Sequence, residues 1–181
     1  LRQRLFFAGE LVKLAERELA GDALNRHGVA MACRNGAVLQ LHSVLTGLLD
    51  DVAVRLRLER SPESLTLDTA VAALAARGMA SPELGRVRGL LESGGWLQEQ
   101  VDDARRCLSS QPDGQREAGA DDDHHEHGHD HHHDQGRIRM IAVVPATAIE
   151  PLSADDFARI RRWIAGWRQL LDEFLVTLDE Y

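Results

Sequence analysis

A stretch of apolar residues between positions 29 and 56 constrains the fold of this chain more than any other feature. Its large apolar side chains recur in steps of three and four, at Val38, Leu41, Leu45, Leu48, Val52 and Leu56. That spacing lines one side of an α-helix. We therefore predict a long core helix against which the other helices pack.

Similar spacing predicts helices in other parts of the chain. Residues 1–20 carry one apolar stripe, shorter helices are expected over 67–77, 82–93 and 96–108, and a final helix begins at Ser153. This last helix has a seven-residue repeat, which suits packing at about 20° against another long helix; the repeat consists of Phe157, Ile160, Ile164, Trp167, Leu171, Phe174 and Leu178. Only 4% of the residues are aromatic, which favours a helical protein over a β-sandwich. The predicted fold class is mainly α, a single-domain bundle of about five helices over residues 1–181.

Residues 109–136 interrupt the helical pattern with a run rich in histidine and aspartate. They include no aliphatic residue larger than alanine, so they cannot bury enough surface to offset the entropy of ordering them. We predict a disordered, low-complexity loop there. The next stretch, 137–146, reads RIRMIAVVPA and is rich in β-branched residues, which predicts one short extended segment.

The loop predicted over residues 109–136 contains the most recognisable ligand chemistry in the sequence. Seven imidazoles lie within ten positions, with carboxylates between them: His124, His125, His127, His129, His131, His132 and His133. Neutral imidazole binds Ni and Zn, and a flexible chain can bring three or four donors to one ion. A defined site also needs fixed spacing and hydrogen-bond partners for its ligands, which a loop of this composition lacks. A solvated linker is therefore the competing interpretation.

Arg34 and His42 are a second candidate pair. Arg34 falls on the apolar side of the long helix, where a guanidinium needs a carboxylate or carbonyl partner that the sequence does not identify. Together with Asn35, the two residues resemble the motif of HEPN ribonucleases, which are also helical, and the resemblance implies RNA cleavage. Here the pair is about 12 Å apart along the helix axis, farther than in the family motif. A core arginine with a partner and an edge histidine are the preferred alternative.

Charge and cysteine content exclude several classes of protein. The formal net charge is −8, and six carboxylates lie between positions 121 and 134, which leaves 23 acidic against 21 basic residues elsewhere. Because no basic face is evident, a nucleic-acid partner is not expected. Cys33 and Cys107 are predicted to be buried free thiols. No signal pattern and no apolar run long enough to cross a bilayer is evident, so we expect a cytoplasmic protein without a membrane partner.

Four stretches together resemble a bacterial family of small proteins with a domain of unknown function. They are Arg4–Ala8, Leu39–His42, the stretch Ser81–Leu97, which begins with SPEL and ends with GWL, and Ile141–Val144. Gln40 stands where this family leads us to expect a second histidine. The resemblance implies a cytosolic helical protein and brings no activity with it.

A second apolar stripe on residues 1–20 bears on the function. Phe7, Leu11 and Leu14 lie on another side of that helix, so they are covered either by another helix of the domain, which we favour, or by a partner chain. We predict a non-enzymatic interaction or accessory protein, with an unidentified protein partner or as a homodimer. Metal binding through the loop and RNA cleavage are the alternatives.

Overall fold

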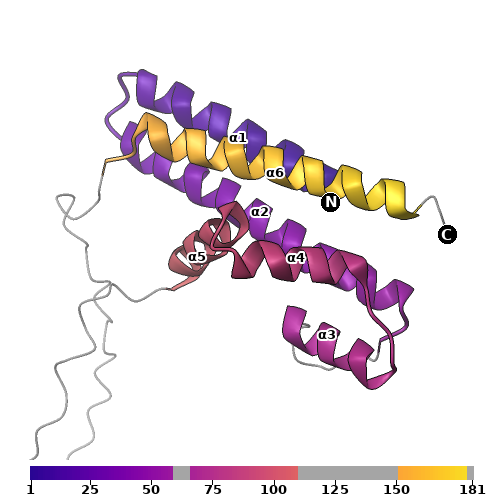
Figure 1. Ribbon diagram of the computed structural model, residues 1–181. Helices are drawn as coiled ribbons and strands as arrows, with labels where there is room; N and C mark the ends of the chain where they lie inside the picture. Colours follow the sequence, from indigo (N-terminus) through magenta and orange to yellow (C-terminus); the bar gives the residue numbers. More distant parts are fainter. Residues whose placement is uncertain (59–65, 110–150, 179–181) are drawn as a thin grey trace, which may run out of the picture. The chain divides into compact units, whose positions relative to one another are not determined.

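The computed structural model describes residues 1–58, 66–109 and 151–178, and all regular structure in these ranges is helical (Figure 1). The helices are α1 (Arg2–Ala20), α2 (Arg26–Arg55), α3 (Leu67–Ala76), α4 (Pro82–Glu92), α5 (Trp96–Leu108) and α6 (Ala154–Leu178). All six belong to one compact unit formed by Leu1–Leu108 and Leu152–Tyr181. The predicted mainly α bundle is confirmed, with six helices in the described part rather than about five.

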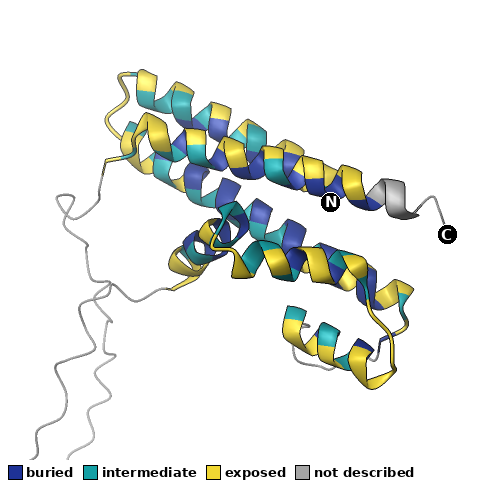
Figure 2. Ribbon diagram, viewed as in Figure 1, coloured by how far each residue is buried: buried dark blue, intermediate teal, exposed yellow. Residues whose placement is uncertain are grey.

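The long second helix occupies the centre of this unit. α2 contacts α1, α3, α5 and α6, and Val38, Leu41 and Val44 are fully buried. Figure 2 shows buried positions along much of α2. From α6, Ile160, Trp163 and Trp167 are buried in the same core. The apolar rows of the second and last helices therefore meet in one interior, as their spacing predicted.

α1 and α2 pack as an antiparallel pair, with glycines at two of their contacts. A Cβ added at Gly36 would lie 3.3 Å from Leu11, and one added at Gly47 would lie 2.7 Å from Leu1. Leu11 and Leu14 are thus half-buried against the core, which is the internal cover that we favoured for the second stripe. Phe7 differs from them, because 43% of it stays exposed.

Two tryptophans position α5 against α6. The Trp96 indole lies on Gly166, where an added Cβ would approach it to 2.6 Å, and it meets Trp167 edge-on at a centroid distance of 5.6 Å. The Trp167 Nε1 in turn donates to Gln100 Oε1 over 3.4 Å. Because α5 also contacts α2, this packing fixes which α5 side chains reach the central helix.

The expectation that no apolar stretch is long enough to cross a bilayer needs correction, and two other expectations cannot be assessed. α2 includes an 18-residue window of mean hydropathy 1.3, so it is long and apolar enough to cross a membrane by length and composition alone. Half of that window is buried in the bundle, as in the core helix of a soluble protein, so the finding is weak. The predicted loop over 109–136, except Ser109, and the extended segment over 137–146 lie outside the described residues.

Candidate functional site

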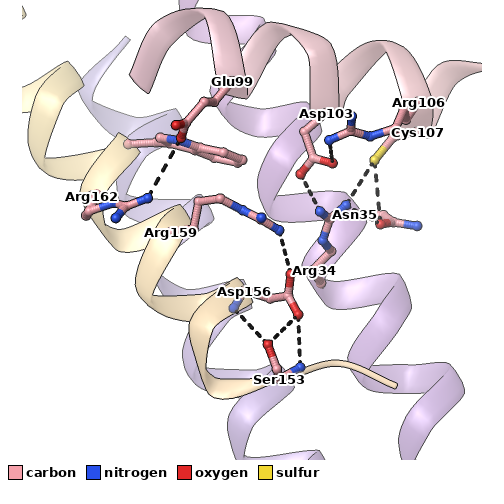
Figure 3. Close-up of polar contacts among 11 residues, drawn as sticks. Arg34, Asn35, Glu99, Asp103, Arg106, Cys107, Ser153, Asp156, Arg159 and Arg162 are labelled. Atoms are coloured by element: carbon pink, nitrogen blue, oxygen red, sulfur yellow. Dashed lines mark hydrogen bonds and ion pairs between the residues drawn. The ribbon is translucent and has the colours of Figure 1, made fainter. Parts of the chain in front are cut away.

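Arg34 is buried where α2 faces α5, and its partner is Asp103. Arg34 is 9% exposed and Asp103 3%, and the guanidinium donates to the Asp103 carboxylate in an ion pair (Figure 3). Arg106 donates to the other Asp103 oxygen over 3.0 Å. A carboxylate shared between two arginines meets the requirement of a buried guanidinium for a charged partner.

The Cys107 thiol completes this polar cluster, which consists of Arg34, Asn35, Asp103, Arg106 and Cys107. Arg34 Nη1 lies 3.4 Å from Cys107 Sγ, and that sulfur lies 3.5 Å from Asn35 Oδ1. Burial, and to a smaller extent the Asp103 charge, raises the pKa of Cys107 despite the opposing effect of Arg34. A thiol that stays protonated is a poor nucleophile, so the cluster lacks an activated cysteine.

A second polar group begins at the start of α6. The Ser153 backbone N–H and hydroxyl each donate to Asp156 Oδ2 over 2.9 Å, and Arg159 donates to Oδ1 over 2.5 Å. Burial alone would raise the pKa of Asp156, but the Ser153 hydrogen bonds and the positive charges of Arg159 and Arg34 together lower it below its ordinary value. The ionised carboxylate therefore caps α6 while its charge also acts on Arg34.

His42 lies in a different environment from Arg34. It lines a groove of about 700 Å³ among α2, α3, α4 and α5, whose apolar lining includes Leu45, Leu91 and Val101. The His42 Nδ1 atom is buried and has no hydrogen-bond partner in the described part of the chain. Burial first, and the Arg105 charge second, lower the pKa of His42. The neutral imidazole is thus favoured.

The structure therefore does not bring Arg34 and His42 to one shared opening. Arg34 is held in its ion pair and is not among the residues that line the groove of His42. The ribonuclease hypothesis stays a prediction, and this geometry adds no support to it. The sequence analysis did not identify Asp103 as the partner of Arg34. A signal for it was present, because Gln100, Asp103 and Cys107 follow one another in steps of three and four beside the apolar residues of α5.

The predicted metal ligands lie elsewhere in the chain. His124, His125, His127, His129, His131, His132 and His133 all fall outside the described residues. Within residues 1–58, 66–109 and 151–178, no three His, Cys, Asp or Glu side chains gather as a possible metal site. The metal hypothesis therefore rests on the sequence alone.

An apolar groove lies where the start of α1 meets the ends of α2 and α6. It encloses about 660 Å³, with Leu1, Leu48, Val54, Leu171 and Phe174 as its apolar lining and Arg2, Asp51 and Arg55 as its charged lining. A smaller hollow of about 380 Å³ beside it shares Arg2 and Leu171 and adds Phe6. Val54 is 60% exposed and Phe6 58%, so this surface presents large apolar side chains to solvent. We call it the terminal groove.

Comparisons with known proteins add nothing to this geometry, because no family model, no curated protein and no solved structure matches the chain. The resemblance to a bacterial family of unknown function stays a prediction for that reason.

Proposed function

We propose that this chain is a non-enzymatic interaction protein that binds another protein through the terminal groove. The observation that supports this most directly is the composition of the groove: five apolar side chains and three charged ones. Grooves of this kind accept the apolar face of an amphipathic helix, whose flanking charges pair with the charged residues at the edge. The terminal groove thus suits a helical segment better than a small polar substrate.

The polar cluster around Arg34 is consistent with the same proposal. Arg34 and Arg106 both pair with the Asp103 carboxylate, and the thiol beside them has a raised pKa. A catalytic site needs a nucleophile or a base that can reach a substrate. The polar cluster instead joins α2 to α5, which is a structural role.

Site-specific crosslinking tests the proposal. A photoreactive amino acid at Val54 should crosslink a protein partner in cells that express the chain, and the same residue at Leu108, which is equally exposed at 60%, serves as the matched control. The partner is then identified by mass, purified and titrated against the wild-type chain. We expect Val54→Arg to weaken its binding at least about tenfold, because the substitution puts a charge into an apolar contact. Equal crosslinking at both positions, or equal affinity of Val54→Arg, would refute the proposal.

A second candidate function is Ni or Zn binding, which the seven clustered histidines between positions 124 and 133 favour. Titration of either metal into the full chain, and into a variant that lacks residues 121–134, tests this function. The full chain should bind several times more tightly than the variant. Equal affinity in the two proteins would exclude metal binding through these residues.

A further inference from the structure

The groove that His42 lines combines apolar and polar side chains from four helices. It lies among α2, α3, α4 and α5 and measures about 700 Å³, within the roughly 300–1,000 Å³ that small-molecule sites occupy. Leu45 and Val101 in its lining are buried, and Leu91 of α4 is half-buried. The groove can therefore cover an apolar body while polar groups hold its other end. We call it the His42 groove.

The charged side chains of the His42 groove fall into two groups. Arg88 donates to Asp68 over 3.2 Å and lies 4.0 Å from Glu92, so these three side chains pair with one another in the lining. Arg105 differs, because its partner at 3.0 Å is Asp102, which does not line the groove. A guanidinium carries five N–H donors, so this pair through Nη1 does not saturate it. Arg105 can therefore donate to a ligand as well.

The surroundings of His42 are positive and leave one of its polar atoms unsatisfied. Burial first, and the Arg105 charge second, lower the pKa of His42, and no carboxylate of the described residues offsets that charge at the imidazole. The buried Nδ1 atom has no hydrogen-bond partner in the same part of the chain. The charges at this end of the groove thus favour an anion, and the leucines favour an apolar body attached to it.

We propose that the His42 groove binds a small organic carboxylate with an apolar chain or ring. The carboxylate accepts hydrogen bonds from Arg105 and lies beside the His42 ring. The apolar part lies along Leu45, Leu91 and Val101. A neutral molecule of the same shape lacks the charge that Arg105 attracts, and an amine is repelled by it. The inference goes beyond the terminal groove and does not depend on it.

Calorimetric titration of octanoate into the full chain at about pH 7.5 tests the proposal. We expect one site with a dissociation constant of about 0.05–1 mM, which is reasonable for a ligand of about ten non-hydrogen atoms. 1-Octanol and octylamine have the same chain with a neutral and a positive head group. Each should bind at least about tenfold more weakly than octanoate, because the head group decides the binding.

Two substitutions in the His42 groove, each with a matched control, locate the site. Arg105→Gln should weaken octanoate binding about fivefold to tenfold. Lys13→Gln should leave it within about twofold, although Lys13 is also 70% exposed and also pairs with a carboxylate three residues away on its helix. Thr46 is exposed in the lining, so Thr46→Trp should fill the groove and weaken binding at least about tenfold. Val54→Trp adds the same ring to the terminal groove and should have no effect.

The pKa of His42 provides a readout at the site itself. Bound octanoate should raise this pKa, because a negative charge beside the imidazole favours its protonated form. The other charged groups in the lining are Arg105 from α5, Asp68 from α3, and Arg88 and Glu92 from α4. Histidine-ring NMR spectra recorded against pH measure the shift, and His42→Gln assigns the signal. Octanol should not shift it.

Each outcome decides the inference. Failure of octanoate to bind up to about 10 mM overturns it, and so does equal binding of octanol or octylamine. Binding that survives both Arg105→Gln and Thr46→Trp, or that Val54→Trp abolishes, would place the ligand elsewhere and also overturn it. Circular dichroism shows that each variant is folded. The crosslinking result at Val54 does not depend on octanoate, so the two proposals fail separately.

Discussion

Removing Asp103 should destabilise the protein more than removing any exposed charge. The Asp103 side chain is 4% exposed and that of Arg34 11%, so Asp103→Leu removes the direct ion pair of a buried guanidinium and leaves Asn35 and Cys107 as its hydrogen-bond partners among the described residues. The loss of one partner from a buried pair costs about 3–5 kcal/mol. This is a large part of the roughly 5–15 kcal/mol that keeps a typical domain folded.

Two further variants complete a double-mutant cycle with Asp103→Leu. Arg34→Met should cost less, about 2–3 kcal/mol, because Asp103 keeps its ion pair with Arg106. The double variant with both substitutions replaces the pair by two apolar side chains and should cost only about 0–2 kcal/mol. The two changes should therefore couple by at least about 2 kcal/mol.

Urea unfolding followed by circular dichroism at each corner of the cycle measures these energies. Arg106→Met is the control, since its side chain is 68% exposed and its removal should cost under about 0.5 kcal/mol. If the double variant loses the sum of the two single losses to within about 0.5 kcal/mol, Arg34 and Asp103 are independent and the reasoning is wrong.

Three further predictions use the same unfolding measurement. Gly166→Ala should lower the free energy of unfolding by about 1–3 kcal/mol, because the added methyl group meets the Trp96 indole. Gly89→Ala is the control: its methyl group meets nothing, so it should raise the free energy of unfolding by about 0.5–1 kcal/mol. An unchanged stability of Gly166→Ala would contradict the close contact with Trp96. The stability that neutral His42 contributes is complete above the ordinary histidine pKa of 6.5 and is lost as the pH falls through the lower folded pKa, so His42→Gln should flatten the decline of stability between neutral and mildly acidic pH, and an unchanged slope would contradict this. The pKa of Asp156 is also lowered, so the stability that it contributes is present above its ordinary value of 3.8 and is lost as the pH falls through the folded value; Asp156→Asn should destabilise the protein at neutral pH and little in strong acid, and an equal loss at both would argue against an ionised cap.

The helices could be predicted from the sequence because their signals are local. The expected ranges 1–20 and 96–108 match α1 and α5 to within a residue, and Ser153 precedes α6 as expected. Apolar spacing, helix-start residues and glycine at helix ends act within a few turns of the chain. The core rows of α2 and α6 followed for the same reason.

The candidate sites could not be predicted, because they depend on how distant helices pack. The sequence showed that Arg34 needs a partner, but the choice of Asp103 depends on the rotation of α5 that Trp96 and Gly166 impose. The terminal groove likewise exists only because the ends of three helices converge there. The spacing placed Phe7 in a second apolar stripe, but we favoured its cover by another helix of the domain, and its 43% exposure could not be predicted.

The position of Arg34 has a consequence for how much the chain length can vary. Arg34 contacts Cys107 near the last turn of α5 and acts on Asp156 in the first turn of α6, so the chain leaves the bundle and re-enters it close to one spot (Figure 3). In general, each doubling of the length of a flexible loop adds only about 0.6 kcal/mol to the free energy of closing it. We therefore expect the assembly of the six helices to depend little on the number of residues between Leu108 and Leu152, as long as they still join the two ends.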